Sequence, residues 1–341
     1  MNEDSIRPDS LRPDLAAAAQ RDMEWLLAHR SEFVRMGCPV CSPSEGATLW
    51  YMRDGFWYYR CTGCGTVYVD PRPPQALLDE YYYRSEVAQC WCGEIYPASE
   101  DVRRNDLCKV RLGQIGTICW RLSVPGWSGW FSKSAIPLVD IGAGYGTFAA
   151  VARTLFTDVI AIEPSPQLAS ACARREGIDT RACSLDRANL ESESASVVTA
   201  FEVIEHVSSP EQFLRTCYRL LVPGGLLVLT CPNADGFDVQ ALGTASSTIS
   251  HEHLTYFTPE SLPALLEAVG FEVVEVDTPG KLDLELVHKA VVAGAIVTPW
   301  IKYLVVDRWG KIDRQAVQQC LADNLLSSHL WVVARKPPEE E

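Results

Sequence analysis

The sequence of 341 residues lacks both a long uninterrupted apolar run and an excess of positive charge. The longest apolar stretch of the C-terminal part, residues 290–301, contains Pro299 and lies between two lysines, so it is too short and too broken to span a bilayer. Lys and Arg number 30 against 44 Asp and Glu, and the resulting net charge of −14 repels nucleic acids and anionic lipids. We therefore expect no membrane span and no nucleic-acid partner.

The N-terminal residues also lack the pattern of a secretory signal, because no cationic stretch leads into an apolar one. We expect a cytoplasmic protein whose 13 cysteines are reduced, since four of them form two C-x-x-C pairs and the others are scattered. A hydrophobic content of 47% is enough for one large domain with a buried core and one or two small modules.

The two C-x-x-C pairs are Cys38 with Cys41 and Cys61 with Cys64, and 19 residues separate them. Two C-x-x-C pairs at this spacing can place four thiolates tetrahedrally around Zn²⁺. A zinc site in which cysteines fill all four positions is structural rather than catalytic. The sequence therefore predicts a structural zinc ribbon over residues 36–72. The alternative is four unrelated buried cysteines.

The spacing of apolar residues divides the rest of the chain into three further segments. Residues 1–35 are expected to form an N-terminal helical arm, and residues 73–133, which follow a proline-rich break, a helical cap of balanced charge. From residue 134 to 336, short β-rich runs alternate with amphipathic helices, which predicts an α/β fold with a Rossmann-like, seven-stranded, doubly wound sheet and a helical insert at about 280–325. The seven expected strands are Leu138–Ile141, Val159–Ile162, Thr180–Cys183, Val197–Phe201, Leu226–Thr230, Phe271–Val276 and His329–Ala334.

A glycine-rich turn follows the first of these strands. Gly142, Gly144 and Gly146 let the backbone approach a ligand closely, and Glu163, at the end of the next strand, can accept hydrogen bonds from the two hydroxyls of a ribose. The spacing differs from G-x-G-x-x-G, and no basic residue follows that would hold a phosphate. The pattern favours a nucleoside without a pyrophosphate over a dinucleotide.

Four blocks in order, residues 140–146, 163–165, 201–206 and 221–225, resemble the class I S-adenosylmethionine-dependent methyltransferases. The resemblance covers residues 136–276 and implies S-adenosylmethionine as the cofactor. It implies that Asp140 and the turn hold the amino-acid end of the cofactor, Glu163 its ribose, and Ser184 and Leu185 its adenine, while Phe201 and Glu202 line its sulfur side. The turn residues assigned to this role are Gly142, Ala143, Gly144 and Gly146.

A third motif, His251-Glu252-His253, follows the fifth strand, at the edge of the sheet where ligands bind. Two imidazoles and a carboxylate provide candidate general bases next to a methyl acceptor. Metal ligation by the two histidines is an alternative, although no third ligand is evident, and hydrogen bonds that hold a loop are another. His206, after the fourth strand, is a further candidate for the acceptor pocket.

The ribbon, the tyrosines at 81–83 and the His-Glu-His loop together resemble the sugar C-methyltransferases and their relatives of deoxysugar and surface-glycan pathways. This resemblance implies that Glu252 and His253 act as bases and that Tyr83 faces the acceptor. Ser250 stands where that group usually has tyrosine before the triplet, so O-methylation is as compatible as C-methylation. We expect a sugar or nucleotide sugar as the acceptor. An RNA base methyltransferase and a non-catalytic cofactor-binding protein are the alternatives.

Overall fold

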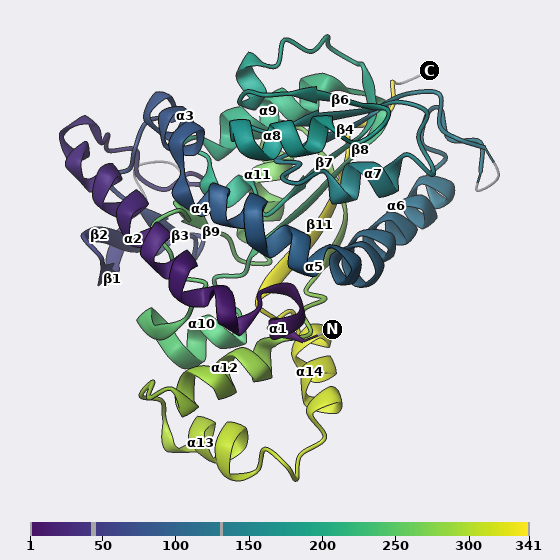
Figure 1. Cartoon of the computed structure of the whole chain (residues 1–341). Helices are drawn as coiled ribbons and strands as arrows, with labels where there is room; N and C mark the ends of the chain where they lie inside the picture. Colours follow the sequence, from purple (N-terminus) through teal and green to yellow (C-terminus); the bar gives the residue numbers. More distant parts are fainter. Residues whose placement is uncertain (1, 42–45, 130–131, 340–341) are drawn as a thin grey trace.

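The computed structural model of the chain describes residues 2–41, 46–129 and 132–339 (Figure 1). Its centre is a seven-stranded sheet with the order β10-β11-β8-β7-β4-β5-β6. Strands β6, β5, β4, β7 and β8 run parallel, whereas β11 is antiparallel to both β8 and β10. The strands are β4 (Leu138–Ile141), β5 (Val159–Ile162), β6 (Ile178–Arg181), β7 (Ala195–Phe201), β8 (Leu221–Pro232), β10 (Glu272–Asp277) and β11 (His329–Arg335).

The seven-stranded α/β sheet expected from the sequence is confirmed. β4 and β5 have the predicted bounds, because strands buried between two helix layers are near-continuous apolar runs, which Asp140 interrupts in β4. The other five strands differ from their predicted bounds by one to five residues at one end or both. β6 begins at Ile178 rather than Thr180, since Ile178 pairs with Val159, and β8 begins at Leu221, so that the Val222-Pro223-Gly224-Gly225 segment lies within the strand.

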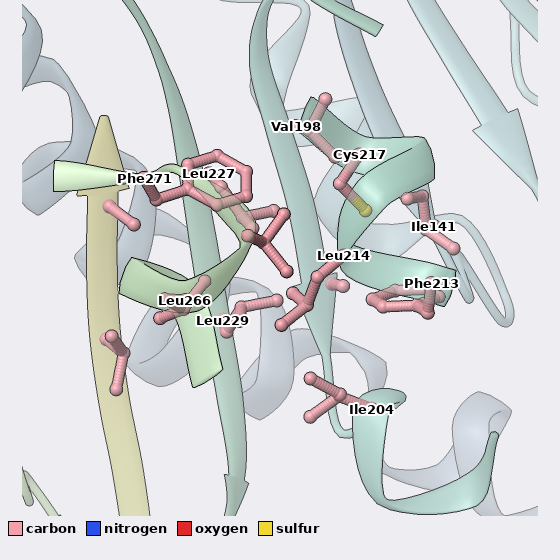
Figure 2. Packing of buried hydrophobic residues seen from close by; sticks show 14 of the residues in the cluster. Ile141, Val198, Ile204, Phe213, Leu214, Cys217, Leu227, Leu229, Leu266 and Phe271 are labelled. Carbon is pink, nitrogen blue, oxygen red and sulfur yellow. The ribbon is translucent and has the colours of Figure 1, made fainter. Parts of the chain in front are cut away.

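Helices cover both faces of this sheet. On one face, Phe213, Leu214 and Cys217 of α9 and Leu266 of α11 pack on β7 and β8, as Figure 2 shows. On the other face, α6 and α7 pack on β4 and its neighbours through residues such as Ile115. The helices of this domain are α7 (Thr147–Ala152), α8 (Pro166–Ala173), α9 (Pro210–Leu220), α10 (Phe237–Leu242) and α11 (Ser261–Val269).

A second, four-stranded sheet has the order β1-β2-β3-β9 and is antiparallel. Three of its strands come from the ribbon segment, residues 36–72. The fourth, β9, directly follows the His-Glu-His loop and therefore comes from the methyltransferase-like part of the chain. These strands are β1 (Ala47–Arg53), β2 (Phe56–Cys61), β3 (Val67–Val69) and β9 (Thr255–Tyr256).

The remaining helices form three groups. The arm contains α1 (Glu3–Ile6) and α2 (Arg12–Ala28), and α2 packs against the cap. The insert, residues 280–325, extends from one end of the sheet (Figure 1) and contains α12 (Asp283–Val292), α13 (Pro299–Lys302) and α14 (Arg314–Asp323). The cap contains α3 (Gln75–Arg84), α4 (Glu86–Cys90), η3 (Trp91–Ile95), α5 (Tyr96–Val102), η4 (Arg103–Cys108) and α6 (Lys109–Arg121).

Within the described residues, none of the helices combines the length and the apolar character that crossing a bilayer requires.

Candidate active site

The glycine turn between β4 and α7 requires glycine for two reasons. Gly142 and Gly144 have φ angles of +69° and +54°, a region that side chains disfavour. A Cβ atom on Gly142 would lie 2.4 Å from Val203 Cγ2, and one on Gly144 would lie 2.9 Å from the hydroxyl of Tyr96. Val203 and Tyr96 thus both lie close to the turn, and Tyr96, which belongs to the cap, covers it.

Two buried carboxyl groups lie beside this turn. Asp140 Oδ1 accepts a hydrogen bond of 2.7 Å from Thr199, and burial raises the pKa of Asp140 to about 7. The two oxygens of Glu163 accept hydrogen bonds from the backbone N–H groups of Gly144 (2.9 Å) and Ser165 (2.8 Å), and burial raises its pKa to about 7. Because a carboxylate has about four acceptor positions, Glu163 can still accept bonds from ribose hydroxyls.

At the end of β7, Glu202 has a φ of +57°, an unusual conformation for a residue other than glycine. Although burial raises its pKa, the ion pair with His329 (3.3 Å) lowers the pKa of Glu202 to about 2 and raises that of His329 to about 9. The guanidinium of Arg111 lies 4.4 Å from the ring centroid of Phe201. Nothing in the sequence alone singled out Arg111, because the cap helix that carries it has no recognisable motif.

The residues predicted to hold the cofactor all lie at or just beyond the carboxyl ends of four adjacent parallel strands, β7, β4, β5 and β6. Ser184 and Leu185, after β6, lie next to the cap, where the Ser184 hydroxyl donates to Asp79 at 3.3 Å. Thr147 Oγ1 and Glu202 Oε1 are buried and have no hydrogen-bond partner within the described part of the chain. Orphaned polar atoms beside a glycine turn fit a polar ligand such as the amino-acid end of the cofactor.

The His-Glu-His loop divides its side chains between two clusters. In the first, the Tyr81 hydroxyl donates to Glu252 Oε1 at 3.0 Å and lies 3.0 Å from His251 Nε2. Since a hydroxyl has only one hydrogen, His251 must donate from Nε2 to complete this chain. Burial raises the pKa of Glu252 to about 7 and lowers that of His251 to about 4.

In the second cluster, His253 meets His206 and Glu205, with one potential ligand atom of each within 4.8 Å of the others. The Nδ1 atoms of His206 and His253 lie 3.0 Å and 2.9 Å from the backbone carbonyls of Glu252 and Thr248, so both Nε2 atoms keep a lone pair. Both carboxylate oxygens of Glu205 are buried without a hydrogen-bond partner among the described residues, and Glu205 Oε1 lies 3.8 Å from His206 Nε2. This set can accept protons or hold a divalent cation, and it provides the third ligand that the sequence did not reveal.

The structure does not bring Tyr83 to either cluster. Its side chain is 67% exposed, whereas Tyr81 and Tyr82 are turned inward. Helical geometry explains this correction, because residues two positions apart on α3 point about 200° apart. Burial, and then the charges of Glu252, Glu205 and Glu163, raise the pKa of Tyr82, so its hydroxyl lies within the electrostatic range of both the loop and the glycine turn.

The ribbon segment fixes the backbone of the His-Glu-His loop. Leu254, the next residue, accepts a hydrogen bond of 2.9 Å from the backbone N–H of Val69 and donates one of 2.7 Å to the carbonyl of Glu205. Strand β3 continues the contact, because Val67 pairs with Tyr256 and Tyr68 with Thr255. The loop is therefore held between the ribbon and the end of β7.

The four predicted metal ligands, Cys38, Cys41, Cys61 and Cys64, converge as expected. Their sulfur atoms all lie within 4.8 Å of one another, and Cys38 Sγ lies 3.6 Å from Cys64 Sγ. Four Zn–S bonds of about 2.3 Å in a tetrahedron place sulfur atoms about 3.8 Å apart. The Cys41 backbone N–H also donates to Cys38 Sγ at 3.4 Å. The cluster is thus compatible with zinc.

Comparison with known proteins agrees with this arrangement. Residues 124–276 match the family described as "Methyltransferase domain". The chain is 30% identical over 181 residues to a probable S-adenosylmethionine-dependent methyltransferase of Mycolicibacterium smegmatis, covering 50% of this chain and 69% of that relative. It is also 29% identical over 157 residues to the mitochondrial ubiquinone biosynthesis O-methyltransferase of Rattus norvegicus (41% of this chain and 45% of the relative). The corresponding enzyme of Roseobacter denitrificans is 33% identical over 150 residues (40% and 60%). The chain thus spans about half the length of these two ubiquinone-pathway relatives.

Proposed function

Because this chain belongs to the S-adenosylmethionine-dependent methyltransferases, we propose that it methylates a small polar acceptor, a sugar or nucleotide sugar, bound between the glycine turn and the His-Glu-His loop. The main support for this proposal is the position of the Tyr82 hydroxyl. This hydroxyl is buried without a partner among the described residues, and it is influenced by carboxylates of both the turn and the loop. Buried polar atoms that lack partners in the free protein are expected to find them on a ligand.

S-adenosylmethionine supplies an electrophilic methyl group when it is bound. Asp140, Glu163 and the glycine turn hold and orient this cofactor, and the cap excludes water above it. Glu252 or His253 removes the proton from the acceptor, which is a hydroxyl or a carbon next to a carbonyl. Tyr81 orients Glu252 through its hydrogen bond and is therefore a positioning residue.

The four cysteines are proposed to bind one structural Zn²⁺. The support is the approach of their sulfur atoms and the direct pairing of the ribbon sheet with β9, next to the base-bearing loop. The metal would then act on catalysis only through the position of Glu252 and His253.

A second candidate is O-methylation of an aromatic hydroxyl, which the names of the ubiquinone-pathway relatives favour. This reaction also needs a single base and a short path from the acceptor to the cofactor. The RNA alternative has less support, because the net charge of −14 opposes binding to a polyanion.

The test is S-adenosylhomocysteine release by the zinc-replete full chain with nucleotide sugars, including 4-keto forms, and with small phenols and tRNA. We expect turnover with a sugar, and mass spectrometry then locates the methyl group on carbon or oxygen. Turnover with phenols alone or tRNA alone would replace the sugar as the acceptor. Binding of the cofactor without turnover on any class would contradict the enzymatic proposal.

A further inference from the structure

We propose that the guanidinium of Arg111, on the cap helix α6, binds the carboxylate at the amino-acid end of S-adenosylmethionine. This inference rests on the proposed function and extends it, because it gives the cofactor's carboxylate a partner from outside the glycine turn and the sheet. The cap is then part of the cofactor site as well as a cover that excludes water.

The face of α6 that carries Arg111 is turned towards the sheet domain. Cys108, in the helical turn directly before α6, and Ile115 are both buried in the core that α6 shares with α7. In Figure 1, α6 accordingly lies beside α7, the helix that follows the glycine turn. Residues three and four positions apart share one face of a helix, so the partly buried side chain of Arg111 extends along the same face.

The end of the Arg111 side chain reaches strand β7 at the edge of the sheet. Its guanidinium lies 4.4 Å from the ring centroid of Phe201, the last residue of β7. The ring of Phe201 also packs edge-on against that of Phe148, in α7, with 4.8 Å between the centroids. Glu202 follows, and its Oε1 atom is buried without a hydrogen-bond partner among the described residues. Arg111 thus lies at the carboxyl end of β7, beside residues predicted to line the cofactor.

The order of the strands assigns this place to the amino-acid end of the cofactor. β7 is the neighbour of β4 on one side, and β5, followed by β6, is its neighbour on the other. Glu163, after β5, and Ser184, after β6, are the residues proposed for the ribose and the adenine. A cofactor whose nucleoside lies over β5 and β6 extends its amino-acid end over β4 and β7, because the glycine turn lies between them. The carboxylate is therefore expected on the side of Arg111.

Two acidic side chains at this end create the need for a cation. Asp140 in β4 and Glu202 after β7 suit the ammonium group of the cofactor, but they repel its carboxylate. Although burial raises the pKa of Asp140 to about 7, the hydrogen bond from Thr199 and then the charge of Arg111 oppose that rise. The guanidinium therefore acts on the same place that the carboxylate must enter.

The donors of Arg111 are available for this role. In the part of the chain that the structure describes, its guanidinium has neither a hydrogen bond nor an ion pair. The other cations near the turn are engaged, because Arg103 donates to two neutral oxygens, Arg175 pairs with a cap carboxylate at 2.7 Å, and His329 pairs with a carboxylate at 3.3 Å. An arginine fork also matches the two oxygens of a carboxylate.

The experiment compares two ligands by calorimetric titration into the full, zinc-replete chain. S-adenosylhomocysteine has both the carboxylate and the ammonium of the cofactor, whereas S-adenosyl-3-thiopropylamine keeps the nucleoside and the ammonium but lacks the carboxylate. We expect the wild type to bind S-adenosylhomocysteine more tightly than the amine. Arg111→Gln should bind S-adenosylhomocysteine about ten- to a hundredfold more weakly than the wild type, because a charge-assisted pair is lost. Its affinity for the amine should be unchanged.

Two further variants make the comparison specific. Arg121→Gln is the matched control, because it removes the same charge from a side chain of the same helix that is 55% exposed, and it should bind both ligands like the wild type. Arg111→Lys keeps the charge without the planar fork and should recover part of the lost affinity. Melting temperatures of all variants separate loss of binding from loss of folding.

Three results would overturn the proposal. They are equal affinities of the wild type for the two ligands, an unchanged S-adenosylhomocysteine affinity in Arg111→Gln, and an equal loss of both affinities in that variant, which would give Arg111 a general structural role. Because binding of these ligands needs no methyl transfer, a protein that binds S-adenosylhomocysteine through Arg111 yet methylates no sugar would contradict only the proposed function.

Discussion

The backbone N–H of Val69, in the ribbon sheet, donates a hydrogen bond of 2.9 Å to the carbonyl of Leu254, the residue that follows the His-Glu-His loop. This bond joins the segment that carries Cys61 and Cys64, two of the proposed zinc ligands, to the segment that carries the candidate bases Glu252 and His253. The ribbon is thus part of the support of the active site.

Removal of the metal should therefore impair catalysis more than cofactor binding. In Cys61→Ser/Cys64→Ser, two of four ligands are lost, and we expect the single zinc to be lost with them. The methyl-transfer rate should fall at least tenfold, while the S-adenosylhomocysteine affinity, which depends on β4 and β5, should change less. Metal analysis and calorimetry measure these quantities.

The same metal analysis also examines the cluster of Glu205, His206 and His253. We expect one metal ion per wild-type chain and none in the cysteine variant. A second ion that persists in the variant would place a cation on this cluster and would leave His253 unavailable as a base.

The three consecutive tyrosines should differ in their effects. Tyr81→Phe removes the hydrogen bond to Glu252, and Tyr82→Phe removes a buried hydroxyl at the site, so each should lower kcat by roughly tenfold or more. Tyr83→Phe is the matched control and should be unchanged, because its side chain is exposed. Steady-state rates at saturating cofactor decide this, and an effect confined to Tyr83 would restore the assignment made from the sequence.

The pH dependence of the rate should identify the base. Burial raises the pKa of Glu252 to about 7, so its carboxyl group is protonated below that pH and accepts a proton only above it. Burial lowers the pKa of His253 to about 3, so this imidazole stays neutral from pH 5 to 9. We expect a rate that rises through pH 7, a rise that Glu252→Gln abolishes together with about 10²- to 10⁴-fold of the rate. A flat profile in the wild type would favour His253.

The packing of α9 on the sheet should be sensitive to cavities. Leu214 is fully buried between α9 and the sheet (Figure 2), so Leu214→Ala should lower the free energy of unfolding by about 2–5 kcal/mol. Val110→Ala, on the exposed side of α6, should change it by less than about 0.5 kcal/mol. Denaturant titration measures both, and similar losses in the two variants would contradict the assigned packing.

The sequence by itself determined the elements whose signals are local. Leu138–Ile141 and Val159–Ile162 are short, mostly apolar runs between helical segments, and Gly142 and Gly144 mark a turn whose φ angles other residues disfavour. The two cysteine pairs likewise carry their spacing in the chain itself. These features depend on residues close in sequence, so the α/β fold and the cofactor-binding edge could be predicted.

Only the tertiary structure decided which distant residues meet. It paired Thr255–Tyr256 with the ribbon, joined His253 to His206 and Glu205, and turned Tyr81 rather than Tyr83 towards Glu252. No local pattern specifies these contacts, because each arises from the packing of elements separated by tens to hundreds of residues. The glycine turn at the carboxyl ends of the strands can thus be predicted from local sequence, whereas the proposed acceptor site depends on contacts between residues that are distant in the sequence.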